Sequence, residues 1–265
     1  METGASSACF YPLETEKAFL RIAKLGFTQS EIFFNSRCEL ERPFINELKA
    51  IRDAYRMNIV SLHPHSSFAE GYNFFSTYER RFDDGLEDYK KYFEAAETLG
   101  AKYIVLHGAK GFCSLNAEQY ADRFNRLNEA AKQFGCIVAH ENVVNFTGET
   151  PEFMRKMKNL LGNSFKMVLD IKQSRRSAVD PFDFIREMGN SIVHLHVSDF
   201  DTSHDCIPPC EQGLFSFEAL FSELAKAGYN GKYIIELYSD SFSDENQILK
   251  SAKYLDGILN KVKQG

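Results

Sequence analysis

Short apolar runs alternate with longer amphipathic segments from one end of this 265-residue chain to the other. A short apolar run is typical of a buried strand, and apolar residues spaced by three or four positions are typical of a helix. Strands are predicted at 5–10, 31–34, 59–62, 103–106, 138–142, 167–170, 194–199 and 233–237. Because strands that alternate with helices pair in parallel through right-handed crossovers, the pattern predicts one parallel sheet covered by helices.

The number of strand–helix units decides between two arrangements of a parallel sheet. Eight units in 265 residues match a closed (β/α)8 barrel, for which about 250 residues are typical. The sequence lacks the glycine-rich dinucleotide fingerprint of open, doubly wound sheets. No linker or low-complexity tract interrupts the alternation. The sequence therefore predicts one domain, residues 1–265, of the α/β class and folded as a single TIM barrel.

Capping residues mark the start of three of the predicted helices. Asn116 is followed three positions later by Gln119, which is the spacing of a capping box. Thr150-Pro151 and Asp180-Pro181 each place a capping side chain before a proline suited to the first helical position. The other helices are predicted at 14–25, 43–57, 83–99, 217–227 and 243–262.

Four consecutive predicted strands in the second half of the chain end on side chains that can bind a metal. These side chains are Glu141, Asp170, His196 and Glu236. In a barrel of this kind the carboxyl ends of the strands meet at the face that carries the active site. Three carboxylates and one imidazole form an oxygen-rich ligand set suited to one divalent cation. The alternative is a salt-bridged polar rim without metal, although buried carboxylates are costly unless they are paired.

The histidines are concentrated at the same end of the predicted strands. All seven lie at a strand end or in the loop that follows one: His63, His65, His107, His140, His194, His196 and His204. Because side chains alternate between the two faces of a strand, His140 points away from Glu141 and is interpreted as structural. His194 shares the inward face of His196 but lies one layer deeper. In the loop after Asp170, Lys172 is a candidate to bind an anionic group of a ligand.

The composition narrows the possible partners and the cell compartment. The net charge of −6 gives no general attraction for nucleic acid or an anionic membrane, so neither partner is expected. The six cysteines show no paired metal-binding spacing, which indicates free thiols in a reducing cytosol. No signal peptide and no apolar run of about 20 residues are evident. We therefore expect a cytoplasmic protein.

At the metal-competent strand ends the sequence resembles the xylose-isomerase-like TIM-barrel superfamily, over essentially the whole chain. The most specific pieces are Leu169-Asp170 with Asp180-Pro181, the segment from His194 to Asp199, and the strand of Glu236. The superfamily includes sugar isomerases and epimerases. The resemblance implies one divalent ion (Mn, Co, Mg or Zn), held by the quartet Glu141, Asp170, His196 and Glu236.

The resemblance also implies a reaction. The two glutamates of the quartet, Glu141 and Glu236, double as the acid/base pair that isomerises or epimerises a small sugar, polyol or sugar phosphate through an enediolate. His63, Lys172 and Gln173 are expected to contact the substrate. Gln173 stands where relatives often carry a histidine. Homodimers and homotetramers are common among such proteins, so either assembly is possible for this chain.

Three alternatives remain on the same scaffold. A lyase of the inosose-dehydratase type would use the same site to eliminate water. A phosphodiesterase like the type IV apurinic endonucleases would use His65, His107 and a bridging Glu141 for a second zinc ion. That class needs a third zinc site, and Gln173 and Ile207 stand where two of its histidines would be. A non-catalytic sugar-binding barrel is the third alternative.

Overall fold

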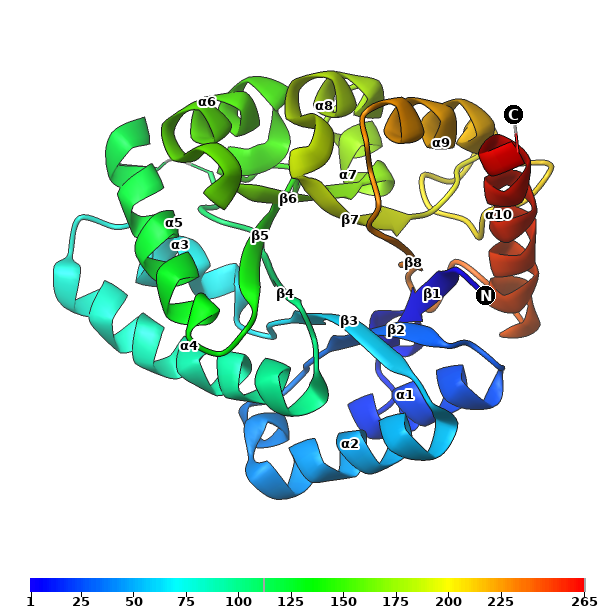
Figure 1. Cartoon of the computed structure of the whole chain (residues 1–265), viewed down its shortest axis with the longest axis horizontal. Coiled ribbons are helices and arrows are strands. Elements are labelled where there is room, and N and C mark those ends of the chain that lie inside the picture. Colours follow the sequence, from blue (N-terminus) through cyan, green and yellow to red (C-terminus); the bar gives the residue numbers. More distant parts are fainter. Residues whose placement is uncertain (112, 265) are drawn as a thin grey trace.

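Eight parallel strands form a closed barrel in the computed structural model, which describes residues 1–111 and 113–264. Each strand pairs with its neighbours in chain order, and β1 closes the ring by pairing with β8 (Figure 1). The strands are β1 (Thr3–Ser6), β2 (Gln29–Phe33), β3 (Asn58–His63), β4 (Tyr103–Leu106), β5 (Ile137–Glu141), β6 (Lys166–Asp170), β7 (Ile192–Val197) and β8 (Lys232–Ile235). The predicted TIM barrel is confirmed.

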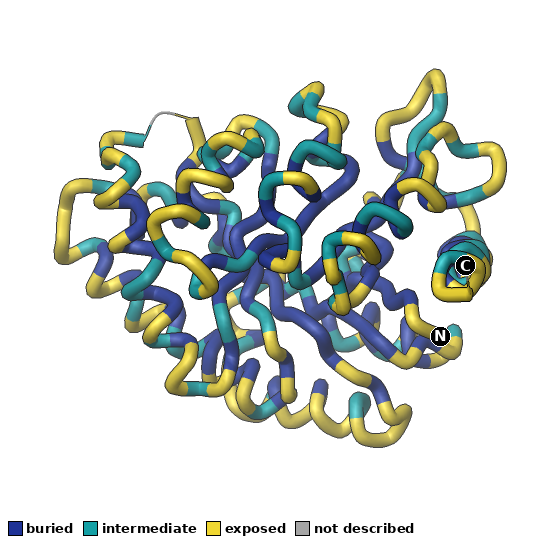
Figure 2. Tube along the Cα trace, turned by 45° about the horizontal axis from the view of Figure 1, so that its top comes forward, coloured by how far each residue is buried: buried dark blue, intermediate teal, exposed yellow. Residues whose placement is uncertain are grey.

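The helices form a ring around the barrel (Figure 1). They are α1 (Thr15–Lys24), α2 (Arg42–Tyr55), α3 (Glu70–Asn73), α4 (Glu79–Leu99), α5 (Ala117–Lys132), α6 (Pro151–Leu161), α7 (Ile171–Arg176), α8 (Pro181–Met188), α9 (Phe217–Lys226) and α10 (Asn246–Gln264). Figure 2 shows that the buried trace converges on the strands and that the outer faces of the helices are exposed. No helix in the described part of the chain has the length and apolarity needed to cross a membrane.

The core has two parts because side chains alternate across each strand. Outward-facing side chains such as Leu169 and Leu195 belong to the large cluster between the barrel and the helices. Inside the barrel, Val105, Ala139 and Val168 form a small separate cluster. Two positions further along each of these strands, the next inward-facing residue lies at the rim of the barrel. Functional residues are expected at this rim.

The predicted helix starts agree with the structure. Asn116 and Gln119 form a complete capping box at α5. Thr150 and Asp180 each accept a backbone hydrogen bond at the first turn of α6 and α8. These local signals position the helices that follow β4, β5 and β6.

The loops at the barrel rim contain structure that the sequence patterns did not predict. Residues 172–176 were expected in a loop, but α7 begins directly after β6 because the Asp170 side chain accepts a hydrogen bond from Gln173 N at 3.0 Å and caps the helix. The segment after β3, expected to be a loop, contains α3. The first strand ends at Ser6, and residues 7–10 form a 3-10 turn.

Candidate active site

The side chains of the predicted quartet meet at the carboxyl-terminal rim of the barrel. Glu141, Asp170 and His196 close or nearly close β5, β6 and β7, and Glu236 follows β8. The Nδ1 atom of His196 lies 3.1 Å from Glu141 Oε1, 3.5 Å from Glu236 Oε2 and 3.8 Å from Asp170 Oδ2. All four residues are buried, and their ligand atoms lie within 4.8 Å of one another.

The hydrogen bonding of the quartet fits a divalent cation. Oε2 of Glu141 and Oδ2 of Asp170 are buried and have no hydrogen-bond partner among the described residues. Ion pairs with His107 and Lys172 compensate these two oxygens only in part, and a bound cation would satisfy them further. One imidazole nitrogen and carboxylate oxygens are suitable ligands for Mn²⁺, Mg²⁺, Co²⁺ or Zn²⁺. The residues present therefore fit the group that the sequence predicts.

Charges around the quartet also favour a cation. Burial is the main reason that the pKa of Asp170 is raised to about 7, with Glu236 and Glu141 adding to the effect and Lys172 opposing it. Burial lowers the pKa of His196, but Glu31, Glu236 and Glu141 together outweigh it and raise that pKa well above its usual value. In the absence of a metal the site therefore retains protons, which a divalent ion would displace.

A second group of metal-competent side chains lies beside the quartet and shares Glu141. His107 Nε2 is 3.0 Å from Glu141 Oε2 and 2.9 Å from His63 Nε2, which is itself 3.7 Å from Glu141 Oε2. The prediction that paired His65 with His107 needs correction, because His63 occupies that place. The chain leaves β3 at Pro64, and His65 turns towards α4, where its Nδ1 is 2.6 Å from the hydroxyl of Tyr92.

The residues predicted to contact substrate line a cavity of about 340 Å³ above the quartet. Its polar wall is formed by His63, His107, Glu141, Lys172, Gln173 and Glu236. Tyr11, Phe33 and Tyr238 line the apolar side. A larger cavity of about 620 Å³ lies beside α10 and contains none of the quartet residues. We therefore place the candidate site in the smaller cavity.

Two residues of α7 reach this cavity in different ways. The buried Lys172 places Nζ 3.1 Å from Glu236 Oε2 and 3.6 Å from Asp170 Oδ2. Gln173 accepts a hydrogen bond from Val144 N at 3.2 Å, which ties the loop after β5 to the helix. Lys172 is thus paired with two members of the quartet.

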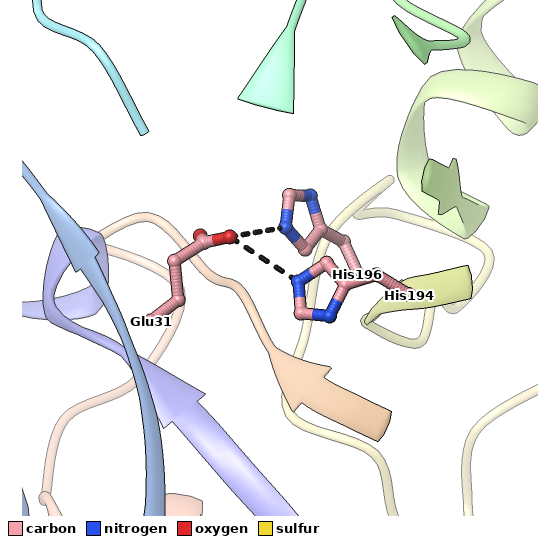
Figure 3. A group of neighbouring side chains, drawn as sticks. All are labelled: Glu31, His194 and His196. Carbon is pink, nitrogen blue, oxygen red and sulfur yellow. Dashed lines mark hydrogen bonds and ion pairs between the residues drawn. The ribbon is translucent and has the colours of Figure 1, made fainter. Parts of the chain in front are cut away.

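Glu31 is the residue at this site that the sequence patterns missed. It lies inside β2 with no solvent exposure and accepts hydrogen bonds from His196 and His194 (Figure 3). It was expected only as the start of an apolar strand. The sequence did contain a signal for Glu31. It stands two positions before Phe33 and therefore on the same face of the strand, and Phe33 lines the cavity.

The remaining strand-end histidines take the positions expected from alternation. His194 lies one layer below His196 and contacts Glu31 and Ser61. His140 points outward to the hydroxyl of Tyr120 at 2.8 Å, and burial lowers its pKa to about 4. His140 is therefore a neutral structural residue.

The comparison with known proteins agrees with this geometry. Residues 19–258 match the model of the family described as "Xylose isomerase-like TIM barrel". This chain belongs to that family, the class that its closed barrel and rim site already indicated.

Individual relatives share only a low sequence identity with this chain, over nearly its whole length. An uncharacterized protein of Mycobacterium leprae is 26% identical, with 91% of this chain and 90% of the relative covered. Fructoselysine 3-epimerase of Escherichia coli O157:H7 is 21% identical over 89% of this chain and 90% of its own. The crystal structure of a D-tagatose 3-epimerase-like protein superposes with a TM-score of 0.80 at 23% identity, covering 100% and 99% of the two chains. The Escherichia coli relative is thus named as a sugar epimerase, and the solved structure as an epimerase-like protein.

Proposed function

We propose that this protein is a divalent-metal-dependent isomerase or epimerase of a small sugar. The observation that carries the proposal is the convergence of Glu141, Asp170, His196 and Glu236 beside a cavity large enough for a monosaccharide. Two of these residues, Glu141 and Glu236, also face that cavity as carboxylates able to exchange protons. A bound divalent ion would polarise the carbonyl and neighbouring hydroxyl of a sugar, which acidifies the adjacent C–H bond.

The two glutamates approach the cavity from strands that are three places apart in the closed ring. One carboxylate can therefore take a proton from one face of the substrate while the other returns a proton to the opposite face, which inverts a carbon centre. Return of the proton to the neighbouring carbon gives aldose–ketose isomerisation instead. The enediolate formed between the two steps is a reason to exclude water from the cavity.

The lining of the cavity favours an uncharged sugar over a sugar phosphate. Tyr11, Phe33 and Tyr238 offer apolar surfaces for the C–H face of a sugar ring or chain. Among the described lining residues Lys172 is the one Lys or Arg side chain, and it is already paired with Glu236 and Asp170. A phosphate would need a free cation at this place.

The first experiment is the metal content per chain of protein purified without chelator, for wild type and Glu236→Gln. We expect about one divalent ion in the wild type and its loss in the variant. Keto-sugars are then incubated with Mn²⁺, Co²⁺ or Mg²⁺, and Glu141→Gln is expected to slow turnover at least ~100-fold. No ion in either protein after soaking would disprove the proposal. A product lighter by one water would identify the lyase alternative, and binding without turnover would identify the non-catalytic barrel.

The cluster of His63, His107 and Glu141 favours a second candidate, a dinuclear site with phosphodiesterase activity. It predicts two zinc ions per chain, one of which is lost in His63→Ala and retained in the matched variant His65→Ala. An abasic DNA duplex is the substrate to test if that result is obtained. One ion per chain in wild type, His63→Ala and His65→Ala alike would exclude the second ion, and two ions in all three would place it away from His63.

A further inference from the structure

Glu31 lies at the centre of the barrel, where four side chains donate hydrogen bonds to it. Its Oε2 is 3.0 Å from His196 Nε2, 3.2 Å from His194 Nε2 and 2.7 Å from Ser61 Oγ. Its Oε1 is 3.0 Å from Ser6 Oγ. The donors come from β1, β3 and β7, so this single carboxylate connects three other strands of the barrel.

This arrangement determines which ring nitrogen of His196 carries a hydrogen when the ring is neutral. An ionised carboxylate only accepts hydrogen bonds, so the nitrogen facing Glu31, Nε2, carries the hydrogen. The lone pair of the neutral ring is then on Nδ1. That atom faces Glu141 Oε1, Glu236 Oε2 and Asp170 Oδ2 at 3.1, 3.5 and 3.8 Å.

We propose that Glu31 is a positioning residue that fixes the orientation and tautomer of His196 so that Nδ1 is presented to the metal of the quartet. The inference rests on the proposed function for the identity of the metal site. Ser6, Ser61 and His194 hold the carboxylate in place, and Figure 3 shows both imidazole rings directed at one oxygen of Glu31. A carboxylate in this position behind a ligating histidine raises the basicity of the ligand and removes its freedom to rotate.

Other interior positions of the barrel argue against a purely space-filling role for Glu31. Val105, Ala139 and Val168 fill the interior of β4, β5 and β6 with apolar side chains. Apolar residues can therefore occupy the interior of this barrel, and a buried carboxylate is the costlier choice. The position of Glu31 directly behind the ligand His196 supplies a reason for that choice.

The test compares Glu31→Gln with Glu39→Gln in the full-length protein. Glu39 is a second buried glutamate, which accepts hydrogen bonds from Thr15 Oγ1 and Asn35 N and does not touch a histidine. We expect Zn²⁺ and Co²⁺ affinity, measured by competition with a chromophoric chelator, to fall about 10- to 100-fold in Glu31→Gln. In Glu39→Gln it should stay within about twofold of wild type, because that change leaves His196 untouched.

A spectroscopic measurement separates positioning from a general loss of stability. Imidazole ¹⁵N spectra of the Zn²⁺-loaded wild type should show hydrogen on Nε2 of His196 and none on Nδ1. In Glu31→Gln, at Zn²⁺ concentrations that fill the site, this signal should broaden or divide between tautomers, because an amide can donate as well as accept. If Glu31→Gln does not fold, Glu31→Asp keeps the charge, withdraws it by one methylene, and is expected to show an intermediate loss of affinity.

Three outcomes would overturn the inference. Wild-type affinity in Glu31→Gln with an unchanged Nε2–H signal would show that Glu31 does not position His196. Loss of one of two bound ions in both Glu31→Gln and His194→Gln would make Glu31 a ligand itself. Failure of the wild type to bind any divalent ion would refute both the role of Glu31 and the proposed metal site of the quartet. Normal ion binding without turnover of any sugar would refute the proposed activity alone and leave the role of Glu31 to be decided by the affinities.

Discussion

The residues that could be identified from sequence are those that close an apolar strand. Asp170 and Glu141 each end a run of apolar residues, and the structure brings them together with His196 and Glu236. Glu31 and His63 were harder to assign for different physical reasons. Glu31 lies within a strand and accepts a hydrogen bond from His196 of β7 across the barrel. A contact between such distant residues cannot be predicted from a local sequence pattern. His63 and His65 are two residues apart, and the turn at Pro64 decides which of them faces the cavity.

Glu70 gives a pH-dependent prediction at the scale of one residue. Its buried carboxylate accepts hydrogen bonds from Tyr89 and from the backbone of His107 and Gly108. Burial raises its pKa from 4.5 to about 7. The folded protein therefore holds this proton more tightly than the unfolded chain does, so the stabilising contribution is full below about pH 4.5 and is lost as the pH rises through about 7.

Glu70→Gln cannot ionise, so its stability relative to wild type should improve between pH 5 and pH 8, on the order of 2 kcal/mol. Urea unfolding at both pH values, with chelator present, measures the difference. Tyr89→Phe serves as the control, because it removes a hydrogen bond and leaves the charge of Glu70. A difference between Glu70→Gln and wild type that stays constant with pH would contradict the assignment.

At the scale of elements, the sequence predicted all eight strands and the helices that alternate with them, because periodicity is a local property. It did not predict the short helices at the rim. α7 contains six residues, of which Arg175 and Arg176 read as a charged loop. Its start depends on Asp170 as a cap, and that residue had already been assigned as a ligand. The structure shows that Oδ1 of Asp170 caps the helix, while its other oxygen, Oδ2, lies near His196 in the candidate metal site.

Two adjacent residues of strand β6 allow the contribution to stability and the proposed contribution to metal binding to be tested separately. Leu169 faces the helices and is fully buried, whereas Asp170 faces the cavity side. Leu169→Ala should lower the free energy of unfolding by about 2–5 kcal/mol because it leaves a cavity. It should change metal affinity little, whereas Asp170→Asn should abolish metal binding. Calorimetric unfolding and metal titration of both variants would test this, and equal loss of affinity in the two would contradict it.

At the scale of the whole molecule, the closed ring is what turns four distant segments into one site. The predicted fold class was correct because eight alternating units leave few other parallel arrangements. The family model matches residues 19–258 of this chain, which contain β2 to β8 and most of α1 and α10. Substrate choice and assembly depend on loop conformations and surfaces that sequence periodicity does not encode.

A metal that binds only the folded barrel should stabilise the whole molecule. At a free ion concentration 100 times Kd the expected gain is about 2.7 kcal/mol. The midpoint of thermal unfolding should therefore rise by several degrees when Mn²⁺, Co²⁺ or Mg²⁺ is added to chelator-treated protein. Glu236→Gln should show no rise, and a rise of equal size in that variant would place the ion elsewhere.

The burial of Lys172 between Glu236 and Asp170 has a consequence for the valence of the ion that the site accepts. Glu141, Asp170 and Glu236 supply three negative charges, and the ammonium group cancels one of them. The ammonium group repels a trivalent ion more strongly than a divalent ion, and the site is poorly hydrated, so Lys172 favours the divalent ion.

Removal of this ammonium group should weaken the preference for a divalent ion. In Lys172→Met, Tb³⁺ should bind more tightly relative to Mn²⁺ than it does in the wild type, by at least about tenfold. Terbium luminescence sensitised by Tyr238, which lines the cavity, measures the binding, and Mn²⁺ competition gives the ratio. An equal change for both ions would contradict this role. The same lysine that resembles a substrate anchor in the sequence would then act as a fixed monovalent counter-ion that makes the barrel selective for divalent ions.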